Sequence, residues 1–518
     1  MLLLGLSFIP TPKFSDTDLE KEWTELNQHI RRIEWENVYK DADQDSNPDE
    51  ENIPPKLKFL KHNRPLPACI DEETNAYTDL CTAQLRNIKP KIKKQYEKNN
   101  NLTPELQASL KKLTDIAKRG KHVFCRSDKD GKIIIISRTD FDLIMTRELQ
   151  KDKVQDLQTN DIDKHLQTIK NDMEAKVEKL HLAGGISDEL LLHTIGLYTD
   201  ENGRYCRVKK YAKYFTIGTL GYSYPLFKTH KLNEQMIKET PSPHIPVRIV
   251  NAVSNITTSR CTAMLEAILK PISILYCGEE YTRDSSHYLE ALISWKEKKI
   301  ATQPLESQYK NLHLIAADVQ ALYLRCNRSL VRKALQEALR CSTFSQHIQS
   351  IIVDLVMYCM ENVITRFGDE LYTQSSGIIT GDNNSVSIAN IAMRFIMKTA
   401  DEILSKCDLV RRFIDDLIMI YLGSLESAEE IKYYLSEIFA EKGLSLTFRH
   451  AHSENEEVKE VEYLDINHVL DPEDPLGFIT KDFIKPTAIN RVFLHGSSYH
   501  PLSTFKSILK ISGNETFK

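Results

Sequence analysis

The stretch LVRRFIDDLIMIYLG at residues 409–423 decides how this chain is expected to fold. Within it, the adjacent Asp415 and Asp416 stand between an apolar run on one side and a longer apolar run on the other. Two β-prone runs that meet at an acidic pair predict a hairpin whose tip presents carboxylates to solvent. Nothing local neutralises these carboxylates, whereas a divalent metal ion would. The alternative is a plain turn between two strands, because aspartate is a common turn residue.

A second apolar run, NLHLIAADVQALYL at residues 311–324, places Asp318 near its end. Separate strand ends can bring distant aspartates together, which is what metal-dependent phosphoryl transfer requires. Apolar residues at helical spacing fill the chain between the two runs and after the second one. The sequence predicts helices over residues 329–340, 347–367, 385–404 and 427–443.

Several segments, taken in order, resemble the motifs of right-handed palm polymerases, and among these the reverse transcriptases of Penelope-like retroelements. AADVQALY resembles motif A, QSSGIITGDNNSVSIAN motif B, RFIDD motif C, and EYLDI the later Phe/Tyr-Leu-Asp motif. Upstream, VFCRSDKDGKIIII, PLFKTHK and PVRIV resemble segments of the family's fingers. Downstream, KPTAINRVFLHGSSYHP is similar to the Lys-Pro-Thr and Ser-x-His-Pro signature of Penelope-like enzymes. The resemblance covers roughly residues 1–510.

The resemblance implies an α+β fold: a right-handed polymerase whose fingers and palm combine an antiparallel sheet with helices. Many Penelope-like proteins continue into a longer helical thumb and a GIY-YIG endonuclease. In this chain we expect a short or truncated thumb and a helical N-terminal extension, and no convincing GIY-YIG endonuclease is found. A short thumb puts processivity in question, and a protein or RNA partner would compensate for it. The expected regions are an extension at 1–115 with an acidic linker near 41–55, fingers with the start of the palm at 116–300, palm at 301–480, and thumb at 481–518.

Carried over by position, Asp318, Asp415 and Asp416 would be the catalytic carboxylates and the ligands of two Mg²⁺ ions, with Mn²⁺ as an alternative. Asp416 would support the site as the second acidic residue of motif C. One metal would lower the pKa of a primer 3′-hydroxyl, and the other would hold the triphosphate. Tyr323, five positions after Asp318, would be a steric gate against a 2′-hydroxyl. The alternative for Tyr323 is a strand aromatic in the core.

Motif B would supply nucleotide contacts through Gln374, Gly377 and Gly381, since glycines let the backbone come close to a ligand. The family usually has Met-Gly-Ser-Pro where this chain has Thr-Gly-Asp-Asn at 380–383. We expect Asp382 to add negative charge near the triphosphate, and so to weaken nucleotide binding or to shift the metal dependence.

Basic residues supply the remaining candidates. Arg248 is the strongest candidate for gripping triphosphate oxygens, because a guanidinium binds them bidentately. Lys129 is a second nucleotide contact, and Lys442 stands where such polymerases often place the proton donor to pyrophosphate. A lysine taken singly is more often a solvated surface charge than a ligand contact. The expected nucleic-acid contacts are Lys228, Lys231 and Lys485.

Composition agrees with an enzyme of several subdomains. The chain has 518 residues, 41% of them apolar, which is ample for a core. Its net charge of −5 is unexpected for a nucleic-acid enzyme. However, acidic residues gather at 41–52, while RNIKPKIKKQYEK and RVKKYAKYF interleave lysines with tyrosine or isoleucine. Such runs suit phosphate contact with stacking, and they are also ordinary helix faces.

Other function classes are disfavoured. The ten cysteines lack Cys-x-x-Cys or zinc-type spacing, so we expect no zinc, no disulfide framework and a reducing compartment. The opening MLLLGLSFIPTPKF is a poor signal peptide. No stretch reaches the roughly 20 apolar residues of a membrane span. We expect a soluble protein with no membrane partner, and the resemblance implies a nuclear one.

Three functions remain open. The first is an RNA-directed DNA polymerase that extends a DNA primer with dNTPs on an RNA template. The second is a catalytically lapsed or domesticated nucleic-acid-binding protein, favoured by the altered motif B and the short thumb. The third is a different palm enzyme, such as a telomerase-like or RNA-templated RNA polymerase. Tyr323 argues against the use of ribonucleotides.

Overall fold

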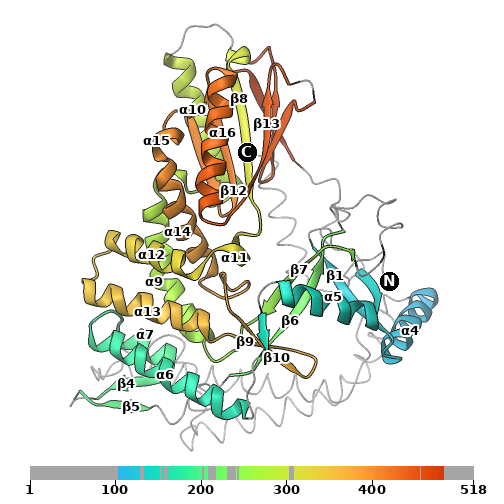
Figure 1. Ribbon diagram of the computed structural model, residues 1–518, viewed down its shortest axis with the longest axis vertical. Coiled ribbons are helices and arrows are strands. Elements are labelled where there is room, and N and C mark those ends of the chain that lie inside the picture. Colours follow the sequence, from blue (N-terminus) through green and yellow to red (C-terminus); the bar gives the residue numbers. More distant parts are fainter. Residues whose placement is uncertain are drawn as a thin grey trace, which may run out of the picture. The chain divides into compact units, whose positions relative to one another are not determined.

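The fold combines α and β structure in a computed structural model of the chain (Figure 1). Contacts divide the chain into two compact units. The smaller comprises Met1–Phe124, Gly131–Ile135 and Asn490–Lys518, and the larger comprises Cys125–Asp130 and Ile136–Ile489. The structure describes residues 103–128, 133–151, 154–156, 161–200, 203–207, 218–229, 241, 244–302, 308–455 and 457–483.

Several predictions fall outside the described residues. They are the candidates Lys129, Lys231 and Lys485, the N-terminal extension and its acidic linker up to residue 102, and the thumb from residue 484. Within the smaller unit the structure describes helix α4 (Pro104–Lys118). This helix begins at Pro104 because the Thr103 hydroxyl accepts a hydrogen bond from the Leu106 amide at 3.3 Å.

A four-stranded antiparallel sheet organises the larger unit. Its spatial order is β11 (Leu409–Phe413), β12 (Asp416–Leu422), β8 (Leu312–Val319) and β13 (Leu446–His452). The central strand β8 has few polar residues because side chains cover both faces of the sheet along most of its length.

Helices cover one face of this sheet (Figure 1). The apolar stripes of these helices pack with Ile315, Ala317, Leu417 and Met419 in the larger hydrophobic core. Among the helices that contribute to this core are α9 (Ser259–Cys277), α12 (Arg328–Ala338), α13 (Gln346–Glu361), α14 (Ser385–Met397) and α16 (Leu425–Glu441).

Each of the four helices expected from sequence is present, but two end early. The second expected helix stops at Glu361, and residues 364–367 form strand β9 (Ile364–Phe367). The β-branched residues Val363, Ile364 and Thr365 explain the change, since such side chains favour strands. The third expected helix is interrupted after Met397 by a tight turn before α15 (Asp401–Leu404).

The opposite face packs on a second core. Tyr288, Leu292 and Trp295 meet Leu314 and Ile418 there. The elements that supply this layer are α10 (Ser285–Thr302) and a three-stranded sheet of β14 (Glu460–Tyr463), β15 (Ile466–Leu470) and β16 (Phe478–Asp482).

A further sheet of the larger unit has the order β1-β6-β9-β10-β3, with β7 also pairing with β6. Strand β1 begins in the smaller unit, and β2 (Ile133–Ser137) straddles the boundary. The bounds of the strands named in this order are β1 (His122–Ser127), β6 (Gly221–Phe227), β7 (Val247–Ala252), β10 (Glu370–Gln374) and β3 (Val154–Asp156).

The described part of the chain contains further helices, one more pair of strands and several 3₁₀ turns. Helices are α5 (Arg138–Lys151), α6 (Ile162–Leu182), α7 (Asp188–Ile195) and α11 (Leu322–Arg325), and β4 (Leu197–Thr199) pairs with β5 (Tyr205–Arg207). The 3₁₀ turns are η6 (Gly278–Glu280), η7 (Gln308–Lys310), η8 (Leu339–Cys341) and η9 (Lys398–Ala400).

Helix α9 corrects one expectation from the sequence. Within the described part of the chain, the 22 residues Ser259–Glu280 are the one helical stretch that is long and apolar enough to cross a membrane by length and composition. A core helix gives the same signal, because burial in protein and burial in lipid both select apolar residues. In this fold Cys261, Leu265 and Leu269 of the helix are fully buried in the larger core.

Candidate active site

The strand register brings two of the predicted carboxylates together. Asp416 on β12 lies directly opposite Asp318 on β8. Directly paired residues point to the same face of a sheet, so both carboxylates share one face. Both also line a cleft of about 610 Å³, together with residues of the β14–β15 hairpin.

Asp415 lies at the tip of the hairpin predicted from the sequence, which is present. Because Phe413 pairs with Asp416, the turn contains only Ile414 and Asp415. Ile414 has φ +55°, which is rare for a β-branched residue and costs backbone strain. The Asp415 carbonyl accepts a hydrogen bond from the Val319 amide at 3.2 Å, which ties the tip to β8.

Gln320 is a residue that the sequence analysis missed. Its Nε2 donates to Asp318 Oδ2 at 2.5 Å and to Thr447 Oγ1 at 3.1 Å. Thr447 lies opposite Asp318 on β13. Gln320 therefore fixes the orientation of the Asp318 carboxylate. The one signal in the sequence was the position of Gln320 two residues after Asp318. That position alone does not show that the Gln320 side chain reaches the Asp318 carboxylate.

Tyr323 lies in α11, immediately after the end of β8. Its half-buried ring packs partly against the larger core. Burial and, to a smaller extent, the Asp415 carboxylate raise the pKa of Tyr323 to about 12, while Arg248 opposes the rise. Three predicted site residues, Tyr323, Asp415 and Arg248, are thus close enough to influence one another electrostatically. The role of Tyr323 as a steric gate stays a prediction.

The loop between β10 and α14 docks onto this region through its glycines. Gly377 has φ +78°, and a Cβ there would lie 2.4 Å from the Tyr323 carbonyl oxygen. The Ile378 amide donates to the same oxygen at 2.6 Å. Gly381 has φ +95°, and a Cβ there would lie 2.6 Å from the Asn251 carbonyl oxygen. These glycines therefore permit close approach between segments of the protein itself.

Two polar candidates of motif B are buried: Gln374 at the end of β10, and Asp382 in the loop. Gln374 Nε2 donates to the carbonyls of Ser376 and Ile378, so its amide holds the loop in shape. Asp382 Oδ1 accepts from Thr262 Oγ1 of α9 at 2.6 Å, and burial raises the pKa of Asp382. The expectation that Asp382 adds an open negative charge near a triphosphate is therefore wrong, because the carboxyl points into the helical layer.

The basic candidates have different settings. Arg248 is exposed on β7, with Nη2 3.6 Å from Asp128 Oδ2. Lys228 follows the end of β6, where its amide donates to the Pro246 carbonyl. Lys442 ends helix α16, with Nζ 3.8 Å from Glu441 Oε2. Their predicted contacts with nucleotide or nucleic acid stay predictions.

The donor set suits magnesium bound together with a substrate. Among the described residues, no group of three or more His, Cys, Asp and Glu side chains is placed to hold a metal ion by itself. Asp318 and Asp416 supply hard carboxylate oxygens on one face, with Asp415 beside them. Magnesium is often held by one or two carboxylates, with water and substrate phosphates completing its shell. The carboxylates fit that mode of binding.

Comparison with known proteins adds little. No protein-family model and no curated protein matches the chain. Among solved structures it is similar to an apo telomerase from Candida tropicalis, at 9% identity and a TM-score of 0.45, over 70% of this chain and 57% of that one. It is also similar to a telomerase from Candida albicans in complex with a TWJ fragment of telomeric RNA, at 10% identity and 0.46, over 75% and 57%.

The chain thus spans a little over half the length of these two telomerase chains. Similarity at this level transfers neither activity nor partners. The functional argument rests on the geometry of the carboxylates and their surroundings.

Proposed function

We propose that the protein is an RNA-directed DNA polymerase of the Penelope-like type, which extends a primer 3′-hydroxyl with dNTPs on an RNA template in the nucleus. One observation carries the proposal: Asp318 lies opposite Asp416 on paired strands, with Asp415 at the adjoining turn. This arrangement gathers carboxylates at the uncovered end of an antiparallel sheet. Nucleotidyl transfer needs carboxylates arranged in this way.

Two Mg²⁺ or Mn²⁺ ions, when bound, would activate the 3′-hydroxyl and neutralise phosphate charge. Asp318, Asp415 and Asp416 would hold them. Gln320 keeps Asp318 in one orientation through the hydrogen bond at 2.5 Å. Arg248 would bind the triphosphate oxygens, and Lys442 would donate a proton to the leaving pyrophosphate.

An exposed sheet face supports a nucleic-acid partner. Tyr222 and Tyr224 lie on the same side of β6, with ring centroids 5.9 Å apart. Stacking of bases on aromatic rings, together with arginines that contact the backbone, is typical of single-strand binding. Strand pairing adds three exposed arginines to this face: Arg126, Arg248 and Arg366.

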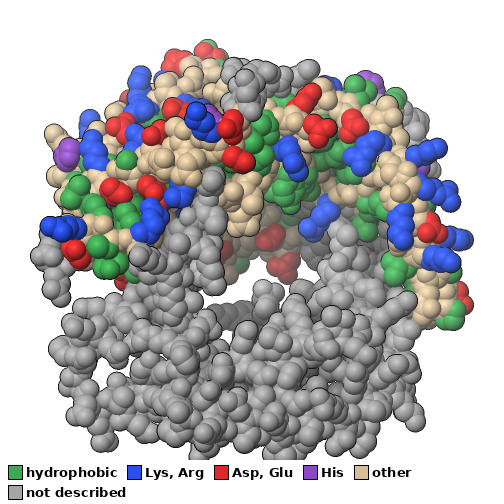
Figure 2. All heavy atoms as spheres, turned by 90° about the horizontal axis from the view of Figure 1, so that it is seen from below, with side chains coloured by type: hydrophobic (Ala, Val, Ile, Leu, Met, Phe, Trp, Pro, Cys, Tyr) green, Lys and Arg blue, Asp and Glu red, His purple; other side chains and the backbone are tan. Residues whose placement is uncertain are grey.

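Charge elsewhere is mixed. On the face shown in Figure 2, Lys and Arg side chains are interspersed with Asp and Glu. With a net charge of −5, attraction to nucleic acid must come from local groups of basic residues such as these arginines. Binding should still weaken as salt is raised, because phosphate contacts release counterions.

A second candidate is a polymerase-derived binding protein without catalysis. The observation that favours it is that no described group of three acidic or His/Cys side chains is placed to hold a metal on its own. The second candidate predicts primer–template binding without extension.

Primer extension on an RNA template with Mg²⁺ and dNTPs separates the two candidates. The control is the Asp415→Asn/Asp416→Asn double variant, which removes charge while keeping side-chain size. The polymerase proposal predicts extension by the wild type and none by the variant, with primer–template binding largely kept. Equal extension by both proteins would overturn the assignment of the site. Binding without extension by the wild type would favour the second candidate.

A further inference from the structure

A buried guanidinium lies directly behind the catalytic hairpin. Arg412 on β11 is three residues before Asp415, and its side chain is 0% exposed. A buried charge is costly unless it is paired and its hydrogen-bonding groups are satisfied. The surroundings of Arg412 meet both conditions, so this position is specified in detail by the fold.

Glu280 of η6 supplies the opposite charge. Its Oε1 accepts from Arg412 Nε at 3.0 Å and from Nη2 at 2.9 Å. Burial by itself would lower the pKa of Arg412, but the Glu280 carboxylate raises it above its ordinary value. Cys277 Sγ lies 3.1 Å from Nη2. The guanidinium therefore stays charged, with its fork fixed in direction.

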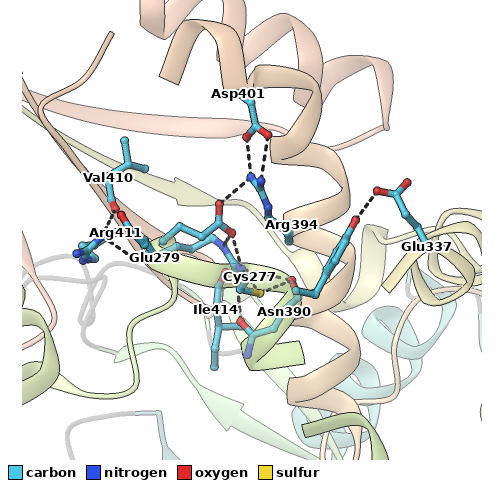
Figure 3. Close-up of polar contacts among 12 residues, drawn as sticks. Cys277, Glu279, Glu337, Asn390, Arg394, Asp401, Val410, Arg411 and Ile414 are labelled. Atoms are coloured by element: carbon cyan, nitrogen blue, oxygen red, sulfur yellow. Dashed lines mark hydrogen bonds and ion pairs between the residues drawn. The ribbon is translucent and has the colours of Figure 1, made fainter. Parts of the chain in front are cut away.

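The remaining donor, Nη1, reaches the hairpin tip. It donates to the Ile414 carbonyl at 3.0 Å and to Asn390 Oδ1 at 2.9 Å. Figure 3 shows that Ile414, Asn390 and Cys277 lie close together, with Arg394 and Asp401 nearby. The arginine thus joins the catalytic turn to helix α14.

The contact with Ile414 bears on Asp415 because the peptide unit is planar. Fixing the Ile414 carbonyl fixes the whole Ile414–Asp415 peptide plane, including the Asp415 nitrogen. On the other side, the Asp415 carbonyl is held by the Val319 amide at 3.2 Å. Both peptide units that flank the Asp415 side chain are therefore restrained. Ile414 would otherwise relax from its unfavourable φ of +55°.

Arg412 and Glu280, together called the brace, are also bonded to residues at a distance from the cleft. Glu280 Oε2 accepts from Arg394 Nη1 at 3.2 Å. Arg394 of α14 in turn donates to both oxygens of Asp401, at 2.6 and 3.0 Å. On the strand side, the Arg412 carbonyl accepts from the Thr282 amide at 2.8 Å. The tip is thus fastened to elements that are themselves packed in the core.

We propose that Arg412 is a positioning residue, which holds the strained Ile414–Asp415 turn so that the Asp415 carboxylate faces the metal and the primer terminus. The proposal rests on the proposed function. A lysine cannot replace this arginine, because one ammonium on a flexible stem cannot bridge Glu280 and the Ile414 carbonyl in fixed directions. Because its side chain is fully buried, Arg412 would act through the turn and not by contact with substrate or metal.

A purely stabilising role predicts different behaviour from a positioning role. Replacing both members of a buried ion pair by apolar residues of similar volume is often neutral or stabilising. The double variant Arg412→Met/Glu280→Met therefore removes the donor to Ile414 together with its counter-charge, while Arg394 keeps its pair with Asp401. Arg412→Lys keeps the positive charge but loses the planar guanidinium with its several donors. It provides the test if the double variant does not fold. The control is Arg332→Met/Asp354→Met, which removes an ion pair of 2.8 Å exposed at the surface.

The experiment measures melting temperature, Mn²⁺ affinity by EPR and single-turnover primer extension for each full-length protein. In Arg412→Met/Glu280→Met and in Arg412→Lys, we expect the Mn²⁺ affinity and the rate of primer extension each to be about 10- to 100-fold lower than in the wild type. Other residues that orient metal ligands have effects of this size. The control should match the wild type. Affinity and rate within twofold of wild type in either folded variant would overturn the proposal. So would a wild type that binds Mn²⁺ no better than Asp415→Asn does.

The two proposals fail separately. A wild type that binds Mn²⁺ tightly but extends no primer would remove the proposed function. The Mn²⁺ affinity of the variants would then still decide whether Arg412 positions Asp415.

Discussion

Two hairpins of the same local design face the same cleft. The turn of β11–β12 contains Ile414 and Asp415, and the turn of β14–β15 contains Leu464 and Asp465. Each places a residue other than glycine at positive φ, +55° and +56°, and each follows it with an aspartate. Local sequence therefore specifies the turn in both hairpins, and the difference between them comes from their surroundings.

The second tip is held by exposed, neutral groups. Asp465 Oδ2 accepts from the Ser285 hydroxyl at 3.1 Å at the surface, and its carbonyl accepts from the Phe483 amide at 2.8 Å. The first tip is held by a buried charged guanidinium at 3.0 Å. The bond from Arg412 to the Ile414 carbonyl has a buried, charged donor, so it contributes about 1.5–3 kcal/mol, whereas a typical hydrogen bond contributes about 1 kcal/mol. The first hairpin therefore has the stronger restraint on the peptide unit that precedes its aspartate.

The largest expected effect is on the carboxylates that share the sheet face. Asp318→Asn should reduce primer extension by about a thousand-fold or more, since metal ligation supplies several kcal/mol of transition-state stabilisation. Asp465→Asn, at the tip of the other hairpin, should leave the rate within a few-fold of wild type. Single-turnover extension on an RNA template measures both. Equal losses in the two variants would erase the distinction between the hairpins.

Substitution of Tyr323, which lies near the first hairpin tip, tests discrimination between ribonucleotides and deoxynucleotides. Tyr323→Ala should raise incorporation of ribonucleotides relative to deoxynucleotides by at least tenfold, because loss of the ring removes a clash worth more than about 1.4 kcal/mol. Tyr323→Phe keeps the ring and should keep the discrimination. Competition between the two sugars in primer extension gives the ratio. Unchanged discrimination in Tyr323→Ala would remove the steric gate.

Two glycines separate packing from backbone strain. Gly377→Ala should destabilise the protein by more than about 3 kcal/mol, since its Cβ would lie 2.4 Å from the Tyr323 carbonyl oxygen and its φ is +78°. Gly368→Ala is the matched control, with φ +61° and nothing within 4 Å of the added Cβ. It should cost only about 1–2 kcal/mol. Urea denaturation measures both, and equal costs would show that the approach to Tyr323 is unimportant.

The smallest effect near neutral pH is expected at His450 on β13, which pairs with Ile315 of β8. Burial lowers the pKa of His450 to about 4, aided by Lys432, His313 and His452, while Glu429 opposes this. The folded state therefore favours neutral His450, whereas the unfolded value is about 6.5. The contribution of neutral His450 to the free energy of unfolding should be fully present above about pH 6.5. It should fall by on the order of 2–3 kcal/mol by about pH 4. Primer–template binding at pH 6.5 and above should not depend on this group.

His450→Gln tests this pH dependence. The variant should show a smaller loss of stability between pH 6.5 and 4.5 than the wild type in urea titrations. A profile parallel to that of the wild type would mean that His450 does not titrate on folding.

The sequence predicted the hairpin and its acidic tip because strand alternation and aspartate in turns are local properties. It also located the four helices, and erred at residues 364–367, where β-branched residues formed strand β9 instead of extending a helix. Helical spacing alone could not separate these alternatives over so few residues.

The brace could not be predicted, because it depends on distant partners. Arg411 and Arg412 are adjacent and identical in type, yet only Arg412 is wholly buried, paired with Glu280 at a separation of 132 residues. Likewise, Asp382 was expected near the triphosphate, but its partner Thr262 lies 120 residues earlier, on α9. One sequence contains no signal for such pairs.

The most direct test of the central claim is cleavage of the backbone by hydroxyl radicals from Fe²⁺ bound in place of Mg²⁺, with primer–template and dNTP present. The account predicts cuts at Asp318 and at Asp415–Asp416, lost in Asp318→Asn and suppressed by excess Mg²⁺. Cuts confined to other parts of the chain, or none that Mg²⁺ suppresses, would contradict the claim that these paired strands hold the catalytic metals.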